Sequence, residues 1–225
     1  MNVNNPSSFF CRASATLEIY NLPTITELKT NLPSKLNWKY ICKKAIKLFW
    51  TKNLQKMLHD KTSLRNMNTK DLKVGSTHLV WISLPANVAD IRKGITKCRM
   101  LTGTYLVQKD KHSFSNGRVD PICPLCGVGD EDIEHMLTRC SALHCIRKDQ
   151  FTRFKELVIS YIGTDAWSQT FNSMQSLVKL ILDCTTFGYL FDSDTQLKNI
   201  MIQSTELWLC YKMHVHRVWK MKDYE

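Results

Sequence analysis

A short segment in the middle of the chain holds four residues whose side chains bind soft transition metals. Cys123 and Cys126 are separated by two residues, and His135 and Cys140 follow, which gives the pattern C-x2-C-x8-H-x4-C. Two cysteines at this spacing can direct both sulfurs into one tight turn, and the histidine and third cysteine can complete a tetrahedron. Gly127 suits the turn because glycine adopts left-handed backbone angles at little steric cost. The spacing predicts one structural Zn²⁺ ion, held by three thiolates and one imidazole.

The identity of the fourth ligand has alternatives, because His144 and Cys145 lie just beyond Cys140 and either could replace it. Cys140 is favoured, since four residues between a histidine and the next ligand is a common zinc-site spacing. A site with four protein ligands has no open position for water or substrate, so it would support folding and not catalysis. The remaining cysteines are expected to be small core residues: Cys11, Cys42, Cys98, Cys184 and Cys210.

The size and composition of the chain narrow its class. Its 225 residues can bury a substantial core, and it has no apolar run long enough for a transmembrane helix. Residues 1–10 lack the charged start and apolar middle of a signal peptide, so we expect an intracellular protein, nuclear or cytoplasmic, without membrane contact. Nine cysteines in such a compartment indicate thiols and metal binding, not a disulfide framework.

Positive charge is concentrated before the CCHC segment. Residues 1–122 contain 20 Lys and Arg against 7 acids, whereas residues 123–225 contain 11 against 13. From Lys29 to Lys56 there are eight lysines and no acid. Such a flank predicts contact with the phosphate backbone of RNA or DNA, and the alternative is a solvated, lysine-rich helix face. The candidate nucleic-acid-binding residues are Lys39, Lys43, Lys44, Lys47, Arg92, Lys93, Lys97 and Arg99.

Apolar periodicity predicts a mainly α fold, a helical bundle with a small CCHC zinc knuckle between a basic N-terminal half and a C-terminal helical half. The expected regions are an irregular lead-in (1–33), a basic helical region (34–122), the zinc knuckle (123–147) and the C-terminal helices (148–225). Helices are expected over 34–58, 87–107, 142–162, 166–184 and 195–221, with a short one around His135. The pattern assigns no secondary structure to residues 59–85, within which 77–82 fit either a short strand or an apolar connector.

Three of these helices have an apolar stripe that is expected to face the core. In the first it comprises Trp38, Ile41, Ala45, Leu48 and Phe49. In the second it comprises Val88, Ile91, Ile95 and Cys98, with Leu101 or Leu106 as a further member. Arg92, Lys93, Lys97 and Arg99 are expected on the opposite, basic side. In the last it comprises Leu197, Ile200, Met201, Trp208, Tyr211, Val215 and Val218.

Signatures of catalysis are weak. The chain has no phosphate-binding glycine loop and no local signature of a Cys–His nucleophile pair. Asp192 and Asp194 are explained by a helix-capping loop before Gln196, and His214 and His216 are not spaced as a metalloenzyme pair. We therefore expect no enzymatic activity and no small-molecule substrate.

The residues around the knuckle resemble the zinc-binding tail of non-LTR retrotransposon reverse transcriptases. The resemblance is carried by RMLTGTY at 99–105, Phe114, CPLCG at 123–127, Glu131-Asp132, His135-Met136-Leu137, Cys140 and Arg147. It is specific over about residues 86–147, and it places the family's metal ligands on Cys123, Cys126, His135 and Cys140.

The resemblance implies binding to element RNA or target DNA during reverse transcription. The chain lacks the paired-aspartate motif of the polymerase and any endonuclease or RNase H signature, so it resembles a tail detached from its polymerase. One alternative is a zinc-stapled structural or protein-interaction module that docks on polymerase domains of the same element, with Trp208, Tyr211 and Trp219 partly exposed. Another is a relic without function.

Overall fold

The structure, a computed structural model, describes residues 8–207 and, for His59, the backbone alone. The chain divides into two compact units. Unit 1 comprises residues 1–60 and 70–76, and unit 2 comprises residues 61–69 and 77–225. This division differs from the four consecutive regions expected from the sequence, because the chain crosses from one unit to the other around residues 61–76.

Unit 1 consists of three helices: α1 (Phe9–Ile19), α2 (Ile25–Thr30) and α3 (Lys35–His59). The expectation of an irregular lead-in is therefore wrong over most of residues 9–30. Thr24 and Glu27 form a reciprocal capping box that starts α2, and the Ser34 side chain accepts a hydrogen bond from the Asn37 N–H at the start of α3, as predicted. These caps mark where α2 and α3 begin, and Pro23 and Pro33 lie in the segments before the two helices.

The apolar stripe of α3 is only partly sheltered. Phe49 packs edge-to-face on Tyr20, with ring centroids 4.9 Å apart, but Leu48 is exposed and the prediction that it is buried is wrong. Residues 70–76 run beside the second half of α3, where the Gln55 amide donates to the Leu72 carbonyl at 2.8 Å. None of the described side chains of unit 1 is fully buried. Unit 1 therefore gains little stabilisation from apolar burial.

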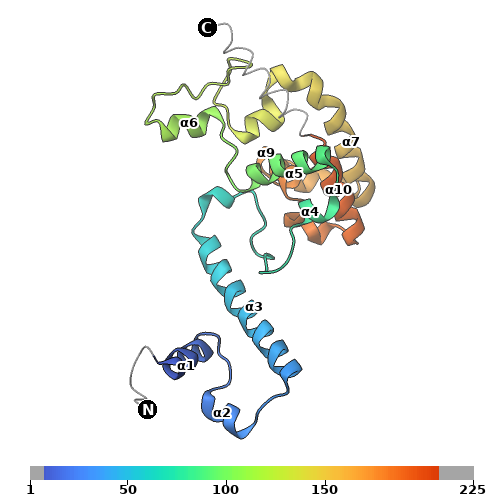
Figure 1. Ribbon diagram of the computed structural model, residues 1–225. Helices are drawn as coiled ribbons and strands as arrows, with labels where there is room; N and C mark the ends of the chain where they lie inside the picture. Colours follow the sequence, from blue (N-terminus) through green and yellow to red (C-terminus); the bar gives the residue numbers. More distant parts are fainter. Residues whose placement is uncertain (1–7, 208–225) are drawn as a thin grey trace. The chain divides into compact units, whose positions relative to one another are not determined.

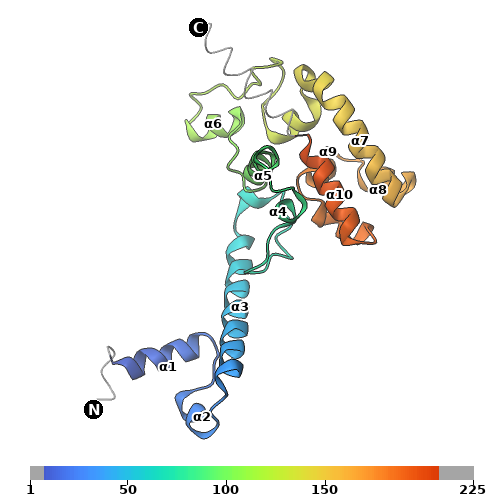
Figure 2. The same cartoon turned by 45° about the vertical axis from the view of Figure 1, so that its right-hand side comes forward.

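Unit 2 holds the hydrophobic core of the described chain, and the regular elements between its residues 61 and 207 are helices (Figures 1 and 2). Its helices are α4 (Leu79–Ser83), α5 (Val88–Leu101), α6 (Gln108–Phe114), α7 (His144–Ile162), α8 (Thr164–Thr170), α9 (Met174–Leu182) and α10 (Asp194–Thr205). Short helical turns lie at η1 (Thr62–Leu64), η2 (His135–Arg139), η3 (Ser141–Leu143) and η4 (Cys184–Leu190). Helix α10 packs against α4, α5, α7 and α9, so it forms the centre of the unit.

The mainly helical fold class is confirmed: residues 8–207 contain no β-strand, and the Cys₃His cluster lies in the middle of the chain. The observed helix boundaries differ from the predicted ones in several places. Residues 79–83 form a helix, which is neither the short strand nor the connector considered for 77–82. The helix expected over 87–107 ends at Leu101 because Gly103 adopts a left-handed φ of 66°. Ile200 and Met201 are buried as expected, whereas Trp208, Tyr211, Val215, Val218 and Trp219 lie outside the described residues.

The orientation of α5 is the clearest error of the sequence prediction. Val88, Ile91 and Ile95 are exposed, and Lys97, expected on the basic outer side, is buried with 3% of its surface accessible. The Lys97 ammonium donates to the Ser204 hydroxyl and, at 3.3 Å, to the Thr205 hydroxyl, both on α10. Burial lowers the pKa of Lys97 to about 8, against the opposing influence of Cys184 and Asp183.

None of the helices found between residues 8 and 207 is both long enough and apolar enough to cross a membrane.

Candidate metal centre

The structure brings the four predicted ligands together. The ligand atoms of Cys123, Cys126, His135 and Cys140 all lie within 4.8 Å of one another. The Cys123 and Cys140 sulfurs are 3.9 Å apart, and the Cys126 sulfur is 3.3 Å from His135 Nε2. Sulfurs that share a tetrahedral zinc ion, with Zn–S bonds of about 2.3 Å, lie about 3.8 Å apart. The donor set and its spacing therefore fit a four-coordinate ion such as zinc, and His135 would bind through Nε2.

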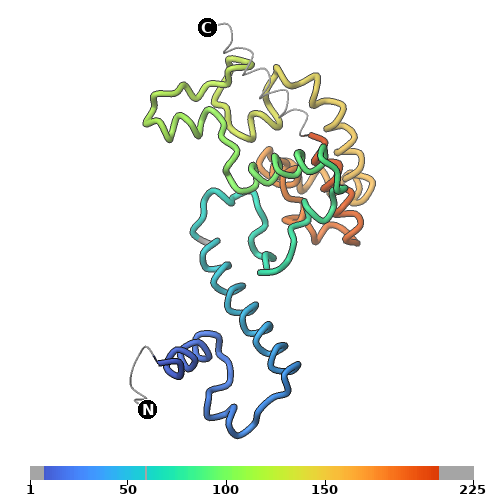
Figure 3. Tube along the Cα trace, in the orientation of Figure 1, coloured from blue at the N-terminus to red at the C-terminus, as the bar shows by residue number. Residues whose placement is uncertain are grey.

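The first ligand pair is carried by a tight turn in the chain (Figure 3). The Gly127 N–H donates to the Cys123 carbonyl at 2.8 Å, and Gly127 has a φ of 65°, a conformation that costs other residues steric energy. An antiparallel bridge between Ile122 and Asp130 closes the loop behind the turn. This geometry confirms the role predicted for Gly127 and presents Cys123 and Cys126 on one side of the turn.

The second pair is carried by the short helix that precedes α7. Its N-terminus is capped by Asp132, whose carboxylate accepts from the His135 N–H at 2.8 Å. Residues His135–Arg139 form a wide π turn, in which the Cys140 N–H donates to the His135 carbonyl at 2.7 Å. Five residues would leave Cys140 far around a regular helix from His135, and the wide turn ending at Cys140 returns its sulfur to the site. The prediction that Cys140 lies at the end of this helix is confirmed.

His144 and Cys145 are exposed on α7 and do not belong to the cluster. Of the other cysteines, Cys184 is buried as expected, and Cys11, Cys42 and Cys98 are half-buried. Cys210 lies outside the described residues.

The cluster is anchored in the core of unit 2. Cys123, His135 and Cys140 are buried, and Cys126 is half-buried at the side where a cavity of about 500 Å³ opens. Met136 and Leu137, between the second pair of ligands, are fully buried core residues. The ligands therefore lie between the solvent-facing turn and the core, as in a structural site that joins a loop to a bundle.

Burial also sets the proton affinities of the metal-free ligands. It raises the pKa of Cys123 to about 12 and raises that of Cys140, and it lowers the pKa of His135. Near neutral pH the imidazole is therefore neutral and ready to coordinate. The Cys123 and Cys140 thiols, in contrast, must release their protons to solvent when a cation binds.

Two charged residues that the sequence did not single out as functional hold this segment in place. The buried Arg147 guanidinium donates to the Met136 and Cys140 carbonyls at 3.3 and 3.2 Å, which satisfies backbone groups at the end of the short helix. The buried Glu131 carboxylate accepts from the Gln108 N–H at 2.8 Å and therefore caps α6 instead of the helix around His135. Arg147 was recognised only as part of the family resemblance, and nothing in the local spacing indicates what it contacts.

We expect the variant Arg147→Ala to bind zinc about 10- to 100-fold more weakly, the range typical when a residue supporting metal ligands is removed. The two carbonyls would lose their donors, and the turn carrying His135 and Cys140 would be held less firmly. Arg147→Lys should recover only part of the affinity because an ammonium cannot reproduce the planar fork. Competition with a colorimetric chelator measures the change. Arg153→Ala, on the exposed side of α7, is the matched control, and an equal loss there would remove the assigned role.

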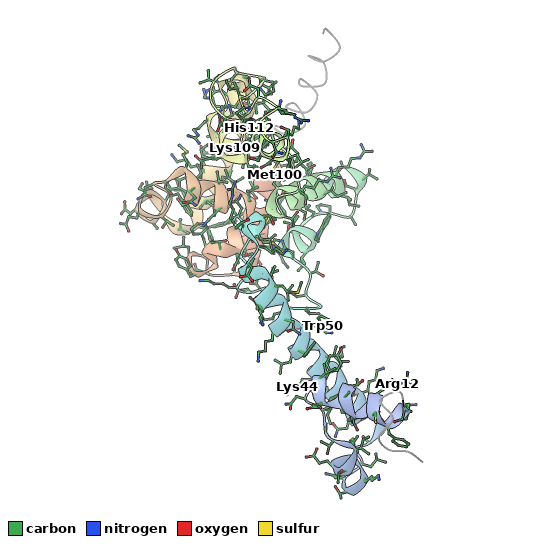
Figure 4. The ribbon with its side chains drawn as sticks, turned by 90° about the vertical axis from the view of Figure 1, so that its left-hand side faces the viewer. Arg12, Lys44, Trp50, Met100, Lys109 and His112 are labelled. Carbon is green, nitrogen blue, oxygen red and sulfur yellow. The ribbon has the colours of Figure 1, made fainter. Side chains whose placement is uncertain are left out.

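The predicted nucleic-acid-binding residues belong to two different units of the chain. Lys39, Lys43, Lys44 and Lys47 are all exposed on α3 of unit 1, and Lys44 is labelled on that helix in Figure 4. On α5, Arg92 and Arg99 are exposed. Lys93 is bonded to Asp90 at 3.0 Å and to Glu206 at 2.6 Å, and the buried Lys97 cannot reach an external phosphate. The α3 lysines are therefore the stronger candidates for phosphate contact.

Comparison of the chain with family models, curated proteins and solved structures finds no match. What can be said of function therefore follows from the cluster and from the charge of the surface.

Proposed function

We propose that this chain is a zinc-binding, nucleic-acid-binding tail module of a retrotransposon reverse transcriptase, without catalytic activity of its own. The observation that supports it most strongly is the cluster of four ligands, whose spacing matches the family pattern and whose atoms lie within 4.8 Å of one another. Zinc at this site would join the turn at Cys123 to the short helix at His135 and so fix the segment that connects α6 to α7.

The nucleic-acid contact in this proposal is made by α3. Seven lysines and no acid lie between Lys35 and His59, and all seven lysines are exposed. Lys39, Lys43 and Lys47 recur every four residues, so they follow one line along the helix. A line of ammonium groups suits the phosphate backbone, which it would bind without reading sequence.

The test is binding of labelled single-stranded RNA and duplex DNA by the zinc-loaded chain at several salt concentrations. We expect a steep loss of affinity with salt, and the variant Lys39→Gln/Lys43→Gln/Lys47→Gln should reduce the log–log slope for single-stranded RNA by about 2, at about 0.7 per lost phosphate contact. The triple variant Lys148→Gln/Arg153→Gln/Lys198→Gln changes three exposed cations of unit 2 and should keep the slope. Absence of binding at physiological salt, or equal slopes for both variants, would refute the proposal.

A further inference from the structure

One face of α5 is exposed, apolar and bordered by positive charge, and the proposed function does not use it. Trp81, Ile91 and Ile95 are 41, 41 and 42% accessible, and Val88 is 68% accessible. At about 100° per residue, Ile91, Ile95 and Val88 are neighbours around the helix, and Arg99 and Arg92 follow at the next edge. We call Trp81, Val88, Ile91, Arg92, Ile95 and Arg99 the α5 outer face.

Trp81 is held in place at the other edge of this face. A Cβ atom at Gly94 would lie 3.0 Å from the indole carbon Cζ3 of Trp81 and 2.9 Å from Cδ1 of Leu84, so only glycine allows α4 to approach so closely. The large aromatic ring is therefore positioned before any partner arrives, and such pre-positioned tryptophans commonly dominate binding energies.

The inner side of α5 has its own partners. Lys97 donates to Ser204 on α10, Lys93 pairs with Glu206 at its C-terminal end, and Met100 and Leu101 lie in the core. The helix therefore needs none of its outer apolar residues for its contacts within unit 2. An apolar helix face beside a fixed tryptophan is the kind of surface on which an amphipathic helix docks.

The positive charge of the α5 outer face indicates which kind of partner can bind there. The guanidinium groups of Arg92 and Arg99 are exposed and make no hydrogen bond or ion pair among those found in the described chain, whereas the Lys93 ammonium on the inner side is paired with Asp90 and Glu206. Basic segments of the chain itself would repel Arg92 and Arg99. Helix α3 has seven lysines and no acid, and residues 208–225 have four Lys and Arg against two acids. A second copy meeting face to face would bring Arg92 and Arg99 against themselves. A nucleic acid would pair with the arginines but would leave Ile91, Ile95 and Val88 without apolar partners.

We propose that the α5 outer face binds an acidic amphipathic helix of a partner protein, with apolar side chains over Trp81, Ile91 and Ile95 and carboxylates against Arg92 and Arg99. Burying apolar groups would supply affinity, and the arginines would select the acidic partner and its orientation. This inference does not depend on the zinc ion or on nucleic-acid binding by α3.

The test uses the full-length, zinc-loaded chain and two fluorescein-labelled helical peptides. One carries a leucine stripe flanked by glutamates, and the other has lysine at each glutamate position. We expect fluorescence anisotropy to show at least tenfold tighter binding of the acidic peptide. The variant Arg92→Glu/Arg99→Glu should reverse this preference, and Ile91→Ser/Ile95→Ser should weaken both peptides at least tenfold. Lys148→Glu/Lys198→Glu, a charge reversal at exposed sites elsewhere in unit 2, should leave the preference unchanged.

Three results would overturn the proposal. The first is a preference that Arg92→Glu/Arg99→Glu does not alter, since non-specific adhesion would behave in this way. The second is a dimer, seen by sedimentation, that Ile91→Ser/Ile95→Ser dissociates, which would make a second copy the occupant. The third is binding of an oligouridine probe that the arginine reversal abolishes while neither peptide binds. Thermal melting of each variant distinguishes these outcomes from misfolding, and the exposure of all four substituted side chains predicts little change in stability.

Discussion

Replacing Cys140 with serine is expected to weaken zinc binding about a hundredfold and to destabilise unit 2. The Cys140 sulfur is fully buried and lies 3.9 Å from that of Cys123, so no water-exposed group can take its place without moving the end of the short helix. A serine hydroxyl stays protonated near neutral pH and is a poor ligand for zinc. Structural zinc sites bind with roughly 10–16 kcal/mol, so one ligand of four accounts for about 3 kcal/mol, or about a hundredfold in affinity.

Metal analysis of the purified chain and urea unfolding measure the two parts of this effect. The wild type should carry one zinc per chain, and Cys140→Ser should carry much less and unfold at lower urea concentration. Cys145→Ser, at an exposed cysteine five residues later, should keep both zinc and stability. If Cys145→Ser lost zinc and Cys140→Ser kept it, the ligand set assigned here would be wrong.

The pH dependence of zinc binding follows from the same site. Because burial raises the pKa of Cys123 to about 12 and also raises that of Cys140, these thiols are protonated in the metal-free chain at neutral pH. Binding then displaces the protons of these two thiols, so the apparent affinity should fall by about a hundredfold for each unit by which the pH is lowered. His135, whose pKa burial lowers, contributes to this loss only in more acidic solution.

The metal ligands could be predicted from the sequence because all four lie in one short segment and local spacing determines whether their side chains can meet. The turn glycine and the position of Cys140 at a helix end followed from the same local geometry. The support given by Arg147 could not be predicted in this way, since it depends on how α7 folds back over the short helix.

The inversion of α5 shows the limit of apolar periodicity. Its sequence offers two plausible inner faces, and the pattern favoured the one with Val88, Ile91 and Ile95. The observed inner face contains Lys97, which is acceptable there only because Ser204 and Thr205, far along the chain on α10, accept its hydrogen bonds. A periodicity within α5 cannot predict a contact with residues so distant in the sequence. By contrast, the capping pair Thr24 and Glu27 was a local signal for α2 that the prediction of an irregular lead-in overlooked.

The buried carboxylate of Asp183 is expected to contribute strongly to the stability of unit 2. Asp183, between α9 and η4, is fully buried and accepts from the Asn68 N–H at 2.8 Å and from the Thr185 hydroxyl at 2.6 Å. His78 Nε2 lies 3.4 Å from the same carboxylate, and His78 Nδ1 accepts from the Val80 N–H, so Nε2 carries the proton that faces Asp183. The carboxylate therefore joins the η1 loop, α4 and η4 within unit 2.

We expect Asp183→Ala to lower the free energy of unfolding by about 3–5 kcal/mol, because it leaves several buried donors without their acceptor. Lys97→Met is the informative comparison, since it removes a buried cation of similar length. Ser204 and Thr205 would still donate to the Met201 carbonyl, at 3.0 and 2.6 Å, so this variant should change stability little. Urea unfolding measures the stability of both variants. Similar losses of stability would contradict the view that Asp183 is the acceptor on which the donors around it depend.

The contribution of Asp183 should also depend on pH in a defined direction. Burial alone would raise its pKa, but the nearby His78 ring and the hydrogen bonds from Thr185 and Asn68 outweigh burial and lower the pKa below the ordinary value. A carboxyl group with a lowered pKa in the folded state contributes stability above its unfolded pKa of about 3.9, and this is lost as pH falls through the folded value. The difference in unfolding free energy between wild type and Asp183→Asn should thus be constant from pH 7 to about pH 5 and shrink below pH 4. Both chains release zinc over the acidic range, so the subtraction cancels that effect, and a difference that grew on acidification would show that the carboxylate is not held in its ionised form.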